Sequence, residues 1–186
     1  MPRLILEVPE RAELPMSRLV PAVLTAALAV YSYFEIRTGL PLLTAHITTH
    51  RGAIVPVSQV LSLGVYISWF LQAFLAALLL GAPYLAPQAL HFGPWRLSRY
   101  SPAQQQRVLP LVRELTGLLA LLVSCYFSAR IYLEIHEARA HGPVLPAGWL
   151  KSIDRTELEW LLALIVICGI VIYLYLAKFD DAAEGG

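Results

Sequence analysis

Apolar residues along the chain gather into four long runs that are separated by polar and proline-containing segments. The uncharged stretches cover residues 19–34, 56–80, 115–129 and 160–177. A helix needs about 20 predominantly apolar residues to cross roughly 30 Å of hydrocarbon. The pattern therefore predicts an all-α fold, an integral membrane bundle of four transmembrane helices with short extramembrane arms. The expected spans are residues 18–36, 56–80, 110–132 and 158–177.

Cap and turn residues refine these boundaries. A Ser-Pro pair predicts that a polar helical stretch begins near Pro102, ahead of the third span. Asp154 and Glu157 form a capping-box pattern, which predicts a fourth helix from about Arg155. The domain limits that follow are 1–16 for an N-terminal arm, 17–178 for the membrane domain and 179–186 for a C-terminal tail.

Composition agrees with a membrane protein and excludes several other classes. Of the 186 residues, 58% are hydrophobic and 15% are charged, whereas a soluble domain has about 45–50% and about 25%. The net charge of +1 creates no strong field that would attract nucleic acid. Two cysteines, both inside apolar runs, cannot form the framework of a disulfide-stapled secreted protein. We therefore expect contacts with membrane lipids and no nucleic-acid partner.

Four spans place both termini and the second loop on the same side of the membrane. That side carries eight Lys and Arg residues and the opposite side carries six. The positive-inside rule therefore favours cytoplasmic termini. The second loop also interleaves basic and aromatic residues, so we expect Trp95, Arg96 and Arg99 to lie at the lipid headgroups.

Small residues recur at four-residue spacing on three of the expected spans. They are Ala22 and Ala26 on the first, Ala73, Ala77 and Gly81 on the second, and Ala120, Ser124 and Ser128 on the third. Small side chains let helix backbones approach closely in lipid. We expect these stripes to face one another inside the bundle, or to form the seam of a homodimer.

Three side chains with polar groups are expected near the middle of the second span. The polar tips of Tyr66 and Trp69 need a partner at that depth. Another helix is the first expectation, and a lipid, quinone or pigment ring is the alternative, which makes both residues candidate cofactor-binding positions. Gln72 is the only conspicuous polar side chain at mid-membrane depth.

The uncharged centres of the four spans contain no Asp, Glu, Lys, Arg or His. Pumps and ion-coupled transporters keep ionisable groups near the midplane, and haem needs an axial ligand such as histidine. The chain also lacks a P-loop, a dinucleotide fingerprint and a nucleophile elbow. We therefore expect no enzymatic activity and no resident cofactor, and transport chemistry is disfavoured.

Histidines gather in the two loops opposite the termini. His46 and His50 would share a face if residues 45–50 were helical, and His136 or Glu134 would complete a metal-binding site. The alternative is that these are solvated loop side chains near the headgroups. Arg130 and Glu134, four residues apart, are more simply explained as an ion pair at the membrane interface.

Two stretches carry a family resemblance. Leu40, Pro41, His46 and Gly52 form a spaced pattern between the first two spans, and residues 104–139 combine a polar helix start, a long apolar helix and a basic exit. Both are similar to a bacterial family of uncharacterised multi-pass membrane proteins, some of them related to toxin-immunity proteins. The family's Pro-Asp after the glycine is replaced here by alanine and isoleucine. The resemblance implies a multi-pass protein of the bacterial inner membrane.

Our main functional hypothesis is a non-enzymatic integral membrane protein: a small accessory or structural subunit that packs against a larger membrane complex, such as an energy-converting one. The strand-like residues 4–8 of the N-terminal arm would also pair with another chain. One alternative is an outer-face metal- or ligand-binding protein that uses His46, His50 and His136. The other is an immunity-like or transport-related membrane protein.

Overall fold

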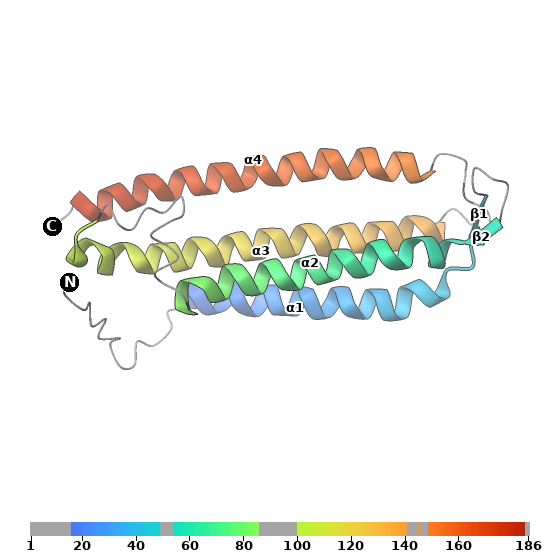
Figure 1. The fold of residues 1–186 in the computed structure, drawn as a ribbon, viewed down its shortest axis with the longest axis horizontal. Helices are drawn as coiled ribbons and strands as arrows, with labels where there is room; N and C mark the ends of the chain where they lie inside the picture. The colour runs from blue at the N-terminus through green and yellow to red at the C-terminus, as the bar shows by residue number, and fades with distance from the viewer. Residues whose placement is uncertain (1–15, 49–53, 86–99, 141–144, 146–148, 185–186) are drawn as a thin grey trace, which may run out of the picture.

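Four long helices make up nearly all of the computed structural model, which describes residues 16–48, 54–85, 100–140, 145 and 149–184. The helices run side by side along the long axis of the molecule (Figure 1). They are α1 (Met16–Gly39), α2 (Val57–Leu85), α3 (Pro102–Ala140) and α4 (Trp149–Glu184). Each is long and apolar enough to cross a membrane. The prediction of an all-α chain with four candidate spans is confirmed.

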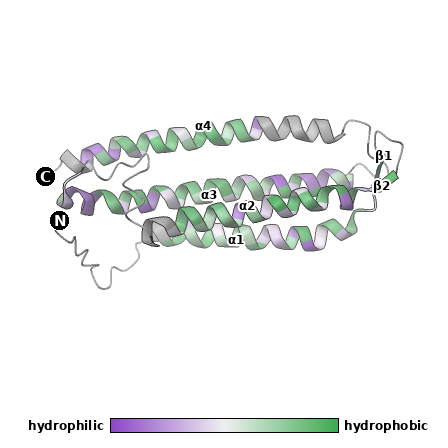
Figure 2. Cartoon of the chain, in the orientation of Figure 1, coloured by the Kyte–Doolittle hydropathy of each residue, from purple (hydrophilic) through white to green (hydrophobic). Residues whose placement is uncertain are grey.

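Hydropathy along the helices explains why they suit a bilayer. The candidate spans have mean hydropathies between 1.6 and 2.6, and the highest value belongs to α4. Figure 2 shows apolar positions along all four helices, with hydrophilic positions concentrated towards the two ends of α3. Helix α3 has 39 residues, a length of about 58 Å at 1.5 Å per residue. It therefore extends beyond the roughly 30 Å of hydrocarbon that a span must cross.

The helix boundaries agree with the sequence at some points and differ at others. Helix α3 begins at Pro102, as the Ser-Pro pair predicts. Helix α4 begins at Trp149 rather than near Arg155, so the capping-box pattern lies inside the helix. The physical reason is that no glycine or proline interrupts residues 149–154, and the helix starts directly after a glycine.

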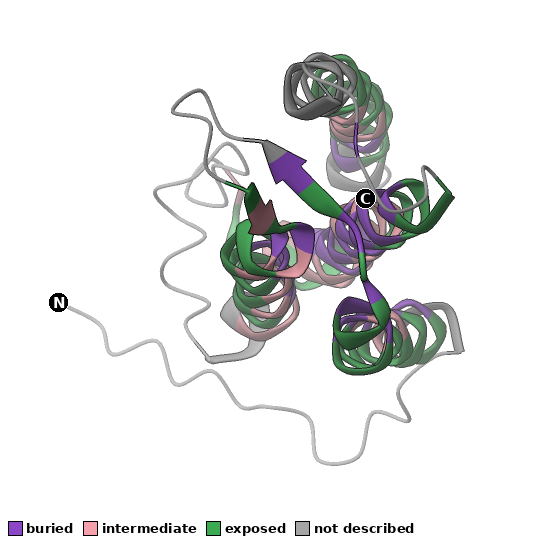
Figure 3. Ribbon diagram, turned by 90° about the vertical axis from the view of Figure 1, so that its right-hand side faces the viewer, coloured by how far each residue is buried: buried purple, intermediate pink, exposed green. Residues whose placement is uncertain are grey.

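Helix α3 is the central element of the bundle and packs against each of the other three helices. Inside the molecule, 44% of its span window is buried, compared with 22% for α1 and α2 and 6% for α4. Figure 3 shows buried positions facing the space between α1, α2 and α3, while α4, uppermost in the view, is largely exposed. The fold is therefore a three-helix core with α4 attached to one side of α3.

The small-residue stripe is confirmed on α3 and wrong on its neighbours. Ala120, Ser124 and Ser128 are all buried. In contrast, Ala26 of α1 and Ala77 of α2 are exposed. The buried face of α2 instead carries Val57, Leu61, Val65, Ser68, Gln72 and Ala76. This buried face includes the small Ser68 and Ala76, so α2 turns a different set of residues inward from the predicted stripe.

A small β-hairpin caps one end of the bundle, where the sequence predicts only loops. Strand β1 (His46–Thr48) pairs antiparallel with β2 (Ile54–Pro56). The Val57 amide donates to the Ala45 carbonyl at 2.9 Å, and the Leu145 amide donates to the His46 carbonyl at 3.2 Å. The hairpin thus connects the α1–α2 and α3–α4 links over an apolar core. That core consists of Ile36, Leu40, Leu43, Ala45, Ile47, Val57, Leu61, Val65, Ile131, Ile135, Ala138 and Leu145.

At the opposite end, the C-terminal part of α4 is held against the N-terminal part of α3. Val108, Val112, Leu115 and Leu119 of α3 form a buried cluster with Tyr175 and Phe179 of α4. The Tyr175 hydroxyl donates to Glu114 Oε1 at 2.8 Å, and the Tyr100 hydroxyl donates to Asp180 Oδ1 at 3.4 Å. These contacts attach the C-terminal end of α4 to α3 and to Tyr100 just before it.

Candidate functional site

A group of polar side chains lies inside the three-helix core, and we call Thr25, Ser32, Gln72, Ser124 and Ser128 the central polar cluster. Gln72 is fully buried and projects from α2 towards α3. Its Nε2 donates to the Ser128 hydroxyl at 2.9 Å and to the Ser124 carbonyl at 3.2 Å. The Ser128 hydroxyl in turn lies 2.8 Å from the Ser32 hydroxyl of α1. One chain of hydrogen bonds therefore joins α2, α3 and α1.

The chain of hydrogen bonds ends on the backbone of α1. The Ser32 hydroxyl donates to the Leu28 carbonyl at 2.9 Å, so the Ser128 hydroxyl donates to Ser32 and lies 3.3 Å from the same carbonyl. In lipid, hydrogen bonds between helices contribute about 0.6 kcal/mol on average and up to about 1.7 kcal/mol. The central polar cluster therefore holds three helices in one register, in a part of the molecule where apolar packing alone is weakly specific.

Trp69 contributes a further link between α2 and α1. Its Nε1 donates to the Ala29 carbonyl at 3.0 Å, and its ring lies against Tyr33, with ring centroids 5.4 Å apart. The neighbouring helix α1 thus supplies the hydrogen-bond partner of Trp69. This agrees with the first expectation from the sequence, a partner on another helix. Tyr66 lies on the exposed side of α2. A cofactor role for Tyr66 and Trp69 stays a prediction.

Three side-chain oxygens of the central polar cluster have no hydrogen-bond partner among the described residues. They are Thr25 Oγ1, Gln72 Oε1 and Ser124 Oγ. All three side chains are at least 98% buried. A buried polar group without a partner costs about 1–3 kcal/mol, and lipid tails offer no hydrogen bonds. This part of the core is therefore the least satisfied polar region that the structure describes.

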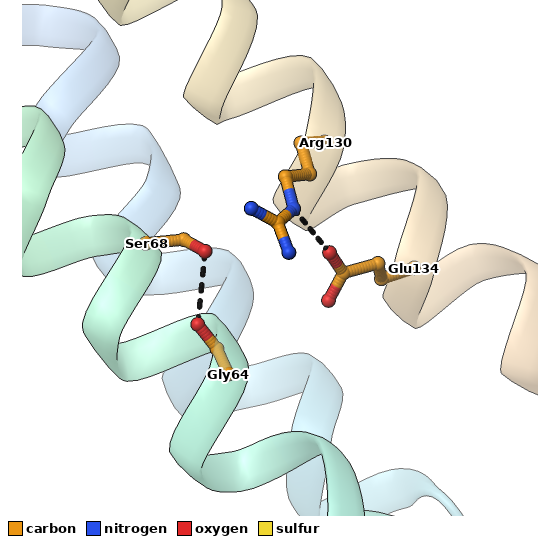
Figure 4. Close-up of polar contacts among 4 residues, drawn as sticks. All are labelled: Gly64, Ser68, Arg130 and Glu134. Carbon is orange, nitrogen blue, oxygen red and sulfur yellow. Dashed lines mark hydrogen bonds and ion pairs between the residues drawn. The ribbon is translucent and has the colours of Figure 1, made fainter. Parts of the chain in front are cut away.

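An ion pair lies on the same side of α3, closer to the hairpin. The Arg130 Nε donates to Glu134 Oε1 at 2.7 Å, and the Glu134 side chain is only 7% exposed. Figure 4 shows both side chains between α3 and the α2 segment that carries Gly64 and Ser68. The predicted pair is confirmed. The burial of this pair between α3 and α2 was not predicted. A spacing of four residues shows that two side chains share a helix face, but not which other helix covers that face.

The three candidate metal ligands that the structure describes, His46, His136 and Glu134, do not form a metal-binding group. His46 is exposed on β1, and this strand is incompatible with the helical geometry that would place His46 and His50 on one face. His136 is exposed and stacks on Tyr132, with centroids 5.1 Å apart, while Glu134 is buried against Arg130. His50 lies outside the described residues.

Among the described residues, no group of three or more His, Cys, Asp and Glu side chains could hold a metal ion. The expected headgroup contacts Trp95, Arg96 and Arg99 also lie outside the described residues. The central polar cluster offers only neutral amide and hydroxyl groups. Its chemistry is hydrogen bonding to a neutral partner, and it contains no side chain that exchanges a proton near neutral pH.

Sequence reasoning found part of this cluster and missed the rest. Gln72 was recognisable as an isolated polar residue in an apolar span, and Ser124 and Ser128 were assigned to a small-residue stripe. Thr25 and Ser32 gave no comparable signal, because hydroxyl side chains are common in spans and usually bond their own helix. The signal that could have found them is the spacing of seven residues, which places both on one helix face.

Comparisons with known proteins give no further assignment for the chain. No protein-family model, no curated protein and no solved structure matches it.

Proposed function

We propose that this chain is a non-enzymatic integral membrane protein, an accessory subunit that packs its helix α4 against a larger membrane complex. The observation that carries the proposal is that very little of α4 is buried inside the molecule. Only 6% of its span window is buried inside the molecule, although it is the most apolar of the four spans. Because helix association in lipid depends on close packing, a helix with so few internal contacts is the natural element to receive a partner.

The exposed surface of α4 also includes a glycine, Gly169, where another helix could approach the backbone closely. A Cβ added to Gly169 would meet no atom within 4 Å. Ile165, Ile170 and Tyr173 around it are exposed apolar side chains. A glycine in such a surface permits a second helix to approach the backbone closely. The proposed contact is therefore a helix of the partner complex seated over Gly169.

The chemistry of the core supports a structural role rather than a catalytic one. The central polar cluster is neutral, and the described contacts of its amide and hydroxyl groups join α1, α2 and α3 to one another. The uncharged span centres give no relay for moving ions or protons. The resemblance noted in the sequence favours the inner membrane of a bacterium as the location.

Isolation from the native membrane in a mild detergent tests this proposal. We expect the native chain to migrate with a larger complex of defined composition on native gels. The variant Gly169→Leu should lose that association, because the added side chain blocks the approach. The matched control Gly64→Leu adds the same side chain at another open position, on α2, and should retain it. Recovery of the native chain only as a free monomer would contradict the proposal.

A further inference from the structure

The three residues that carry the unpaired oxygens of the central polar cluster lie within about one helical turn of one another along the bundle. Helices α1 and α3 run parallel with a constant offset of 96 residues, since Ser32 meets Ser128 and Pro21 meets Gly117 at that offset. Thr25 is therefore level with residue 121, less than one helical turn from Ser124. Helical turns repeat every 5.4 Å, so the two hydroxyls lie within about one turn of each other along the axis.

Gln72 lies at the same level from the side of α2. Trp69 of α2 meets Ala29 of α1, and the two helices run in opposite directions because α2 follows α1 across the bundle (Figure 1). Three residues further along α2, Gln72 is level with residue 26, next to Thr25. Its amide also bonds the Ser124 carbonyl directly. Each of the three core helices thus contributes one unpaired oxygen to a common level.

Other hydroxyl side chains in these helices are satisfied in a different way. Ser32, Thr38 and Ser68 each donate to the backbone carbonyl four residues earlier. Thr25 and Ser124 could do the same, yet neither makes that bond. Their hydroxyls are therefore free to bond a molecule in the core. The orientation of the Gln72 amide is also well defined, because the reverse orientation would place its oxygen against the Ser124 carbonyl.

We propose that one water molecule is bound in the core between Thr25, Gln72 and Ser124. Water donates two hydrogen bonds and accepts two, and buried waters typically make about three bonds to otherwise unsatisfied groups. One donated bond reaches Gln72 Oε1, which can only accept, and the two hydroxyls either donate or accept. A metal cation fits less well, because the carboxylates of α3 nearest to Ser124 are Glu114 and Glu134, each ten residues away. Ten residues correspond to about 15 Å along the axis, and both carboxylates have other partners: Glu114 accepts from Tyr175 and Glu134 is paired with Arg130.

Removing either hydroxyl should change the stability of the fold in opposite directions, depending on whether a water is bound there. If water is bound, Thr25→Val and Ser124→Ala each remove one of its partners and should lower the folding equilibrium constant about three- to tenfold. Without water, each variant only deletes an unsatisfied buried hydroxyl, and stability should be unchanged or higher. The matched control Thr38→Val removes a hydroxyl that is exposed and bonded to its own helix, and should change the constant less than twofold.

The double variant adds a test of shared occupancy. Two residues that bind the same water should show effects that are not additive, whereas independent sites add. The measurement is reversible unfolding of the full chain in lipid–detergent micelles. Neutral or stabilising single variants with additive effects would overturn the proposal.

A direct measurement on the unmodified chain keeps the proposal testable if the variants fail to fold. In vesicles of phosphatidylcholine and phosphatidylglycerol, water-edited solid-state NMR should transfer magnetisation from water to Ser124 Cβ. The internal control is Ile131 Cβ, about two turns away on α3 and equally buried. Transfer to Ser124 well above that to Ile131 supports the bound water, and equal transfer to both would overturn it.

Discussion

Gly39 shows how closely the helices approach at the level of single residues. A Cβ at this position would lie 2.8 Å from Ile135 Cγ2 and 3.0 Å from Arg139 Nη2. The arginine can move, but Ile135 is almost fully buried. The absence of a side chain at Gly39 therefore allows the C-terminal end of α1 to contact α3 and to lead into the hairpin cap.

We predict that Gly39→Ala lowers the free energy of unfolding by about 1–2 kcal/mol, because overpacking against Ile135 outweighs the gain in helix propensity. The control is Gly64→Ala, where an added Cβ meets no atom within 4 Å. That variant should be neutral or more stable by up to about 1 kcal/mol. Denaturation with sodium dodecyl sulfate in mixed micelles provides the comparison, and destabilisation of both variants to the same extent would refute the close approach.

Gln72 joins α2 to α3 through two side-chain hydrogen bonds. We predict that Gln72→Leu lowers the free energy of unfolding by about 1–2 kcal/mol, because two interhelical hydrogen bonds are lost. The same substitution at the exposed Gln59 of α2 should change it by less than about 0.5 kcal/mol. Equal effects at both positions would show that the amide contributes no specific contact.

At the scale of elements, the attachment of α4 depends on its C-terminal end. We predict that Tyr175→Phe lowers the free energy of unfolding by about 1–2 kcal/mol, because the hydrogen bond to Glu114 is lost in a buried cluster. Tyr173→Phe makes the same change at a residue that is 73% exposed and should have little effect. If both variants matched the native protein in thermal unfolding, this junction would not hold α4.

Sequence patterns predicted the long elements well and the short ones poorly. The spans follow from apolar runs whose length the bilayer dictates. The β-hairpin was missed because its two strands have three residues each, although β-branched residues on both sides of Arg51 and Gly52 are a usable signal. Which side of each helix is buried depends on neighbouring helices. A stripe such as Ala73 and Ala77 could therefore not be distinguished in advance from the face of Gln72.

In the molecule as a whole, four candidate spans would place both termini on the same side of a membrane. We predict that reporters fused to the N-terminus and to the C-terminus are active on the same side of the membrane, which the distribution of basic residues favours as the cytoplasmic side. A reporter inserted at residues 49–53 should be active only on the opposite side. Termini on opposite sides would mean that one of the four apolar helices does not cross.

Packing of α4 against a helix of another membrane protein is tested by site-specific photo-crosslinking in the native membrane. A photoreactive amino acid replaces the exposed Ile165, one turn from Gly169 on α4, or, as the control, the exposed Ile67 on α2. We predict that irradiation joins the Ile165 position to one defined membrane polypeptide, while the Ile67 position gives no such product. Cross-links from the Ile165 position to lipid alone would show that α4 has no protein partner there.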